Sequence, residues 1–198
     1  MSSIKKKDLQ KIYNKEIDYL YDGLNNINNP YHFFCLSTNF NNNPFSRTVV
    51  LRNIKKNPLR LFFNADIRSP KINHLQISSN CSVLFYDNKR RKQLRFLCTA
   101  KIHHQNQTSR NIWDKTPLQS RKCYMGKFSP SSIVENYEPN IPKKYLKSDP
   151  SIEDSKQGYD NFSSVELQIY NSDILELHHD GHIRFNIDAK NNYKFIAP

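Results

Sequence analysis

Paired cysteines are missing from this 198-residue sequence. The four cysteines, Cys35, Cys81, Cys98 and Cys123, stand far apart, and none belongs to a C-x-x-C pair. This spacing indicates neither a zinc site nor a dithiol redox motif. The first three lie in apolar stretches, where a reduced cysteine behaves as a small core residue. We therefore expect free thiols, no metal site and a reducing compartment.

Long apolar runs are missing as well. No stretch reaches the roughly 18 consecutive apolar residues from which a membrane-spanning helix is predicted. Residues 1–7, MSSIKKK, lack the apolar region of a secretion signal. Both absences predict a soluble, cytoplasmic protein without a membrane partner.

Acidic residues are scarce relative to basic ones. The chain has 30 Lys and Arg against 18 Asp and Glu, which gives a formal net charge of +12. That charge suits a nucleic acid, a membrane surface or a small phosphorylated ligand. Helix-turn-helix, zinc-finger and RNP patterns are absent, and lysine is spread along the chain beside asparagine runs such as 41–43. We interpret most of the charge, including Arg90–Lys92 in a predicted turn, as solvated surface, and nucleic-acid binding as the weaker alternative.

The usual catalytic motifs are also absent. No Ser-His-Asp, zincin or P-loop pattern occurs. The histidine pairs His103-His104 and His178-His179 fill adjacent positions, so their side chains diverge on a strand and one metal would rarely bind both. We therefore interpret these histidines as structural or surface residues.

The length suits a single domain over residues 1–198. Apolar residues recur every three or four positions from Leu9 to Leu24, which predicts a helix over residues 5–24 that Gly23 and the following asparagines bring to an end. From Tyr31 the pattern becomes that of short strands joined by turns. We expect strands near residues 31–38, 45–53, 59–64, 82–86, 94–103, 162–170, 174–178 and 182–187.

A short helix should begin after Ser69, because serine suits the N-cap and Pro70 the first helical position. Further helical stretches are expected at 108–113 and 118–124, followed by a long loop at 126–158. The expected order is a barrel core over 30–104, helices and loop over 105–160, and closing strands over 161–198. Because strands and helices do not alternate along the chain, we favour a mainly β fold, an antiparallel, closed or nearly closed barrel with flanking helices, over a parallel sheet.

The strongest candidate site combines two stretches, RTVVLR at 47–52 and FFNADIRSPK at 62–71. Arg47 and Arg52 have opposite parity on a regular strand, so we expect them to serve different partners. Ser69 and Lys71 stand at a helix N-terminus, where backbone N–H groups and the helix dipole attract an anion. This combination predicts a phosphate site, although two surface strands with solvated bases and a plain N-cap are an equal alternative from spacing alone.

These stretches, followed by LFYD at 84–87, KQLR at 92–95 and Thr99-Ala100, resemble the FMN-binding core of the pyridoxamine 5'-phosphate oxidase family in order and spacing. The resemblance covers residues 30–125 and, less closely, the C-terminal strands. It implies an antiparallel split β-barrel, FMN as cofactor, and a homodimer that holds FMN between its protomers.

The resemblance also implies roles for individual residues. Arg47 and Lys71 would bind the FMN phosphate with help from Ser69, and Arg52 stands where the family has a basic residue near the reactive side of the flavin. The family's backbone contacts to the isoalloxazine edge fall on three consecutive residues, Thr48, Val49 and Val50.

Further positions match more remotely. Asn64 and Ala65 match a pair beside the ribityl phosphate, and Gln93 matches a glutamine that reaches the flavin from the partner subunit. Near the C-terminus, Gly181–Phe185 resembles a closing motif in which Arg184 meets the flavin and His182 approaches the substrate. A plain hairpin turn at Asp180-Gly181 with exposed polar residues is the alternative.

The chain departs from true pyridoxamine 5'-phosphate oxidases at substrate positions. LELHHD at 175–180 replaces a tryptophan and an Arg-Leu-His run, and an acidic residue near the expected arginine would repel a substrate phosphate. A second phosphate cluster is not reproduced, and Arg121 is either its substitute or a helix-surface arginine. We therefore expect a divergent FMN-dependent oxidoreductase, either an oxidase or a reductase, that acts on a small molecule which the sequence does not identify. Arg52 and His182 are the candidate residues at the substrate or the flavin edge. The alternative is a non-catalytic protein of the same fold that binds FMN or another cofactor.

Overall fold

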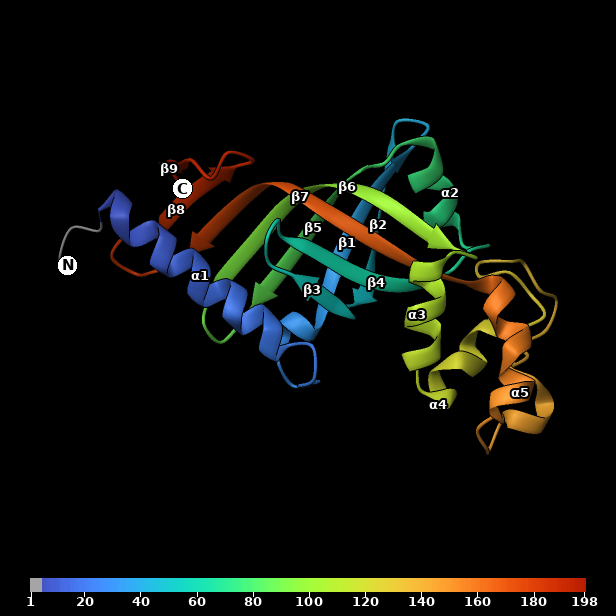
Figure 1. Cartoon of the computed structure of the whole chain (residues 1–198). Coiled ribbons are helices and arrows are strands. Elements are labelled where there is room, and N and C mark those ends of the chain that lie inside the picture. Colours follow the sequence, from blue (N-terminus) through green and yellow to red (C-terminus); the bar gives the residue numbers. More distant parts are fainter. Residues whose placement is uncertain (1–4) are drawn as a thin grey trace.

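Figure 1 shows the computed structural model of the chain, which describes residues 5–198. The helices are α1 (Lys6–Asp22), α2 (Pro70–Ile77), α3 (Gln107–Lys115), α4 (Leu118–Arg121) and α5 (Ile152–Ser155). The strands are β1 (Phe33–Phe40), β2 (Asn43–Val50), β3 (Asn53–Lys55), β4 (Arg60–Asp66), β5 (Asn80–Asp87), β6 (Lys92–His104), β7 (Phe162–Glu176), β8 (Ile183–Asp188) and β9 (Tyr193–Phe195). Short 3-10 turns cover Pro30–His32, Lys122–Tyr124, Lys143–Tyr145 and Lys156–Asn161. Within residues 5–198, no helix is both long and apolar enough to cross a membrane.

All strands belong to one antiparallel sheet. Its order is β2-β1-β5-β6-β7-β4-β3, and β8 and β9 extend it from β7. β2 and β3 are nearly consecutive in sequence but occupy the two ends of this order. The sheet therefore curls until its ends approach, because only Leu51 and Arg52 separate β2 from β3 in the chain. The ends form no ladder, so the sheet is not closed and the fold is a mainly β split barrel with flanking helices.

β7 is the strand that divides the sheet. One edge pairs with β6 along its whole length, with an irregularity between Leu97 and Cys98. On the other edge, residues 162–168 pair with β4 and residues 171–176 pair with β8. The expectation of two strands, 162–170 and 174–178, was wrong, because the ladder with β6 keeps the chain extended between them.

The expected strand 45–53 was also wrong, since it forms two strands. β2 ends at Val50, and the amides of Leu51 and Arg52 bond to the carbonyls of His32 (2.9 Å) and Phe62 (2.8 Å) instead of extending the ladder with β1. The remaining predicted strands and helix α2 agree with the structure to within a few residues. The short helix α5 lies inside the segment that the sequence placed in a loop.

Aromatic side chains fill the inside of the curled sheet. Among those at most 2% exposed are Tyr31, Phe34, Phe63, Phe85 and Phe96. Their rings meet edge-on or tilted at centroid distances from 5.2 to 6.1 Å. Because burying each such side chain contributes about 1.5–3 kcal/mol, this cluster is a main source of stability.

Helix α1 covers one end of this core. Leu9, Ile17 and Leu20 are buried against it, as their three- and four-residue spacing predicts. Gly23 then ends the helix, and a Cβ there would lie 2.9 Å from the backbone carbon of Tyr31. The close approach of the two segments therefore requires glycine, although its φ of −61° is open to any residue.

A buried carboxylate ties α1 to the sheet. Glu16 is fully buried, and its oxygens contact Lys92 Nζ (2.8 Å), Arg90 Nη1 (2.9 Å) and the Tyr31 hydroxyl (3.2 Å). Lys92 also pairs with Glu176. The expectation of a solvated Arg90–Lys92 turn was therefore wrong for two of its three residues. Glu176 is likewise compensated inside this cluster, so its charge does not act as a free repelling group.

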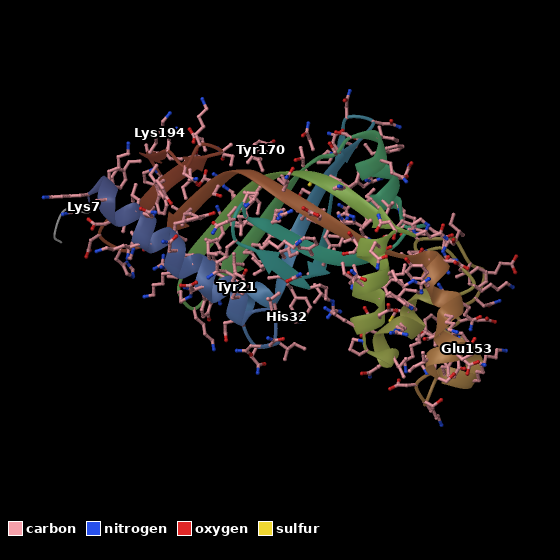
Figure 2. All side chains as sticks on the ribbon, viewed as in Figure 1. Lys7, Tyr21, His32, Glu153, Tyr170 and Lys194 are labelled. Carbon is pink, nitrogen blue, oxygen red and sulfur yellow. The ribbon has the colours of Figure 1, made fainter. Side chains whose placement is uncertain are left out.

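The helices after β6 form a separate lobe. Trp113, Tyr159 and Phe162 make an apolar cluster there, and Figure 2 shows Glu153 of this lobe at the opposite end of the molecule from Lys7. Arg121 is 6% exposed and donates to the carbonyls of Thr116 and Asp114 and to Ser155 Oγ (3.0–3.1 Å). It is a buried structural residue and neither the surface arginine nor the anion contact that the sequence suggested.

We predict that Glu16→Gln lowers the free energy of unfolding by about 3 kcal/mol, because it leaves Arg90 and Lys92 without their buried carboxylate. Urea denaturation followed by circular dichroism measures the loss. Asp18→Asn is the matched control, since Asp18 pairs with Lys56 in an exposed position, where such a pair contributes little to stability. Equal losses in the two variants would contradict the role of Glu16.

Candidate functional site

The turn between β4 and α2 carries part of the predicted phosphate site. The carboxylate of Asp66 accepts hydrogen bonds from the amide and guanidinium of Arg68 (2.7–3.0 Å). Arg68 also donates to the carbonyl of Gly126 (3.1 Å), which fixes the turn against the next segment. Ser69 is the N-cap residue of α2, as expected, but its hydroxyl donates to the Asp66 carbonyl and forms no cap hydrogen bond.

Arg47 and Lys71 come together from β2 and α2. Arg47 Nη1 donates to the carbonyl of Leu36 (3.1 Å) and to Thr38 Oγ1 (2.8 Å). Burial lowers the pKa of the Lys71 ammonium and the charge of Arg47 lowers it further, while Asp66 raises it. The two cations therefore lie close enough to repel each other, and neither pairs with a carboxylate among residues 5–198. This arrangement suits an anion.

His74 lies beside this pair on α2. Its ring is 5% exposed, stacks on Phe40 (4.8 Å, 9°) and tilts against Phe45 (4.8 Å, 53°). Nδ1 lies 3.0 Å from Thr38 Oγ1. Burial lowers the pKa of His74 and the charge of Arg47 lowers it further, so the imidazole is neutral near neutral pH. The sequence analysis missed Thr38 and His74, which come near Arg47 through the packing of α2 against β1.

Asn64 and Ala65 face opposite sides of β4. Ala65 packs into the core, and its carbonyl accepts a hydrogen bond from Ser163 Oγ (2.8 Å). Asn64 faces away from the core, and its Oδ1 is buried without a hydrogen-bond partner in the described part of the chain. Ser164 lies directly opposite on β7, and its Oγ is likewise buried without a hydrogen-bond partner among the described residues. Of the predicted pair, Asn64 thus offers an unused acceptor, whereas Ala65 is committed to the core.

Arg52 lies exposed between β2 and β3, beyond the end of the regular strand. Burial raises the pKa of the Tyr124 phenol, and the charge of Arg52 opposes that rise. Arg52 and Tyr124 are therefore near each other, although Tyr124 comes from the 3-10 turn after α4. Arg47 and Arg52 lie in different surroundings, and the expectation that they serve different partners stays a prediction.

The outer face of β2, β1, β5 and β6 is exposed and apolar. Large side chains 37–46% exposed on it are Phe33, Leu84, Tyr86 and Leu97. Thr48 and Val50 face the same side, whereas Val49 packs toward the core. Gln93 stands opposite Tyr86 in the β5–β6 ladder and so belongs to this outer face.

Arg184 extends the outer face to β8. It donates to both carboxylate oxygens of Asp173 (2.9 and 3.2 Å), which also binds Arg95 (2.5 Å). Burial opposes ionisation of Asp173, but hydrogen bonds from Arg184 and Arg95 outweigh it and lower the pKa of that carboxyl. Arg184 is thus held in place by a carboxylate on β7.

His182 is exposed in the turn before β8. Gly181 has a φ of 118°, which favours glycine, and the His182 Nδ1 accepts a hydrogen bond from the amide of His178 (3.2 Å). β8 and α2 lie at different ends of the sheet (Figure 1). Within this chain, His182 and Arg184 therefore do not meet Arg47 and Lys71.

Residues 14–104 match the family described as pyridoxamine 5'-phosphate oxidase, FMN-binding domain. Over this stretch the chain is similar to that family. The matched residues include Arg47, Lys71 and Gln93, whereas Arg184 and His182 lie outside them. No match was found among curated protein sequences.

Solved structures agree with the family in fold. A pyridoxamine 5'-phosphate oxidase-related, FMN binding protein from Nostoc punctiforme has a TM-score of 0.71 at 19% identity, covering 93% of this chain and 96% of its own. PhzG from Burkholderia lata, in complex with tetrahydrophenazine-1-carboxylic acid, has a TM-score of 0.63 at 14% identity, covering 100% and 94%. A Clostridium acetobutylicum protein related to general stress protein 26 has a TM-score of 0.57 at 12% identity, covering 93% and 97%. The predicted split-barrel fold is therefore confirmed.

We predict that the wild-type chain loses more stability on acidification than Asp173→Asn. The folded-state pKa of Asp173 lies below its ordinary 3.8, so its contribution is present above that value and disappears as the pH falls through the folded pKa. Unfolding free energies of the two proteins should differ at about pH 5 and converge toward about pH 2. Asp18→Asn, at an exposed carboxylate, should follow the wild type. Parallel curves for wild type and Asp173→Asn would rule out this contribution.

Proposed function

We propose that the chain binds FMN through a phosphate pocket formed by Arg47, Ser69 and Lys71, and that it is an FMN-dependent oxidoreductase acting on a small organic molecule. The observation that carries the proposal is that Arg47 of β2 and helix α2, which carries Lys71, meet at Thr38, inside the stretch that matches the FMN-binding family. Arg68 forms an ion pair with the carboxylate of Asp66, so the positive charges of Arg47 and Lys71 stay available to a ligand.

A phosphate monoester fits this set of donors. Arg47 uses Nη1 for the protein and keeps Nε and Nη2 without a partner among residues 5–198. Lys71 adds an ammonium in the first turn of α2, where the helix dipole also favours an anion. An anion placed between the two cations would relieve the repulsion that lowers the pKa of Lys71.

The neighbouring residues would serve the rest of the cofactor. We place Arg52, the backbone of Thr48–Val50 and the unpartnered Oδ1 of Asn64 beside it. Bound FMN supplies hydride acceptance, and the protein supplies anchoring, orientation and charge. The guanidinium of Arg52 would favour negative charge at the reactive edge, which needs no side-chain nucleophile.

A homodimer would complete the site. Gln93 on β6 and Arg184 on β8 lie on the outer face of the sheet, and β8 lies at the other end of the sheet from α2 (Figure 1). They reach a ligand at Lys71 only if a second copy presents them. Leu97 and Tyr86 on the same outer face offer the exposed apolar surface that such an association buries. We propose His182 of the second copy as a substrate-side residue.

The substrates that we consider for this chain extend beyond vitamin B6 compounds. PhzG, which has the same fold, was solved with tetrahydrophenazine-1-carboxylic acid bound. Anaerobic mixing of the FMN-loaded protein with NADH, NADPH or pyridoxamine phosphate tests the activity. Bleaching of the flavin absorbance supports an oxidoreductase, whereas a non-catalytic binder would keep its spectrum with every reductant.

We predict that Lys71→Gln weakens FMN binding by about 10- to 100-fold, because a charge-assisted hydrogen bond to the phosphate is lost. Quenching of FMN fluorescence during titration with apoprotein measures the dissociation constant. Lys11→Gln, at an exposed position on α1, should bind like the wild type. A wild-type protein that takes up no FMN would refute the proposed function.

We predict that Leu97→Glu converts the dimer to a monomer, because it places a charge on the apolar outer face. Sedimentation equilibrium measures the mass of each form. Ile152→Glu is the matched control, since Ile152 is 67% exposed on α5 and away from that face. An unchanged dimer in Leu97→Glu would exclude the outer face as the interface.

A further inference from the structure

We propose that Thr38 and His74 are positioning residues that hold the guanidinium of Arg47 in the orientation needed to bind a phosphate. The proposal rests on the proposed function, because it concerns the same pocket. Thr38 lies on β1, Arg47 on β2 and His74 on α2, so the three side chains join the elements that build the pocket. Neither Thr38 nor His74 would touch the phosphate itself.

The geometry fixes one end of the guanidinium. Arg47 Nη1 donates to two acceptors on β1, the Leu36 carbonyl (3.1 Å) and Thr38 Oγ1 (2.8 Å). Two acceptors on a single nitrogen hold the plane of the group, so Nε and Nη2 keep a constant direction. An arginine held in this way loses less conformational freedom when it binds a planar or tetrahedral oxyanion.

Chemistry decides which group donates in the hydrogen bond between Arg47 and Thr38. A guanidinium only donates, so Thr38 Oγ1 accepts from Arg47. The Thr38 hydroxyl proton then needs an acceptor, and His74 Nδ1 at 3.0 Å is the one that the described residues provide. Thr38 is 4% exposed, so water does not replace His74. His74 is therefore the neutral tautomer with its proton on Nε2, in agreement with its lowered pKa.

Packing holds His74 where this acceptor is needed. Phe40 and Phe45, which flank the β1–β2 turn, contact the ring from two directions at 4.8 Å. His74 also stands three positions after Lys71 on α2, so both side chains lie on neighbouring parts of one helix surface. A shift of α2 would thus move Lys71 and His74 together, and His74 supports Arg47 through Thr38.

The experiment compares FMN with riboflavin, which has the same ring system without the phosphate. Thr38→Val keeps the shape of the side chain and removes the hydroxyl. We expect Thr38→Val to bind FMN about 10-fold more weakly, because the guanidinium loses its orientation. Riboflavin affinity should change by less than about twofold, since the ring contacts stay intact. Thr38→Ser keeps the hydroxyl and should restore FMN binding to the wild-type value.

His74→Phe provides a second test, because it keeps an aromatic ring between Phe40 and Phe45 and removes the acceptor. It should show the same selective loss for FMN, and combining it with Thr38→Val should add little, since both break one chain of hydrogen bonds. Equal weakening of FMN and riboflavin, or unchanged FMN binding in both variants, would overturn the proposal. A wild type that binds neither flavin would instead refute the proposed function, and the positioning role with it.

Discussion

The continuous ladder between β6 and β7 is the constraint on which the rest of the structure depends. Because one edge of β7 is fully paired, its other edge serves β4 first and β8 afterwards. The irregularity opposite Leu97 and Cys98 reverses which side chains point inward, from Leu167 before it to Ile174 after it. β4 leads directly into α2, so β7 separates the proposed phosphate pocket from Arg184 on the outer face of β8.

Two carboxylates of the sheet and of α1 are compensated by basic side chains, in contrast to the proposed pocket. Glu16 is matched by Arg90 and Lys92, and Asp173 by two arginines. Arg47 and Lys71 remain without a carboxylate partner among residues 5–198, and burial makes their charges costly there. Two cations that are kept together in this way destabilise the folded chain. Such unfavourable arrangements are common at ligand sites.

Much of the fold followed from local patterns. The spacing of Leu9, Ile17 and Leu20 predicted α1, and Ser69-Pro70 predicted the start of α2, because helix periodicity and N-terminal preferences act over a few residues. The boundaries inside 45–53 and 162–178 were not predictable in this way. They depend on which neighbouring strand accepts the backbone hydrogen bonds, and those partners come from distant parts of the chain.

For the site, the sequence by itself determined which basic residues and which helix start are candidates, and the resemblance to a family determined their expected ligand. Only the tertiary structure decided which of these basic residues remain available. It assigned Arg90 and Arg121 to buried structural contacts and left Arg47 beside Lys71. It also brought Thr38 and His74 to Arg47. The physical reason is that pairing of side chains depends on strand register and on the packing of α2 against β1, and neither is encoded in the short-range pattern of residues.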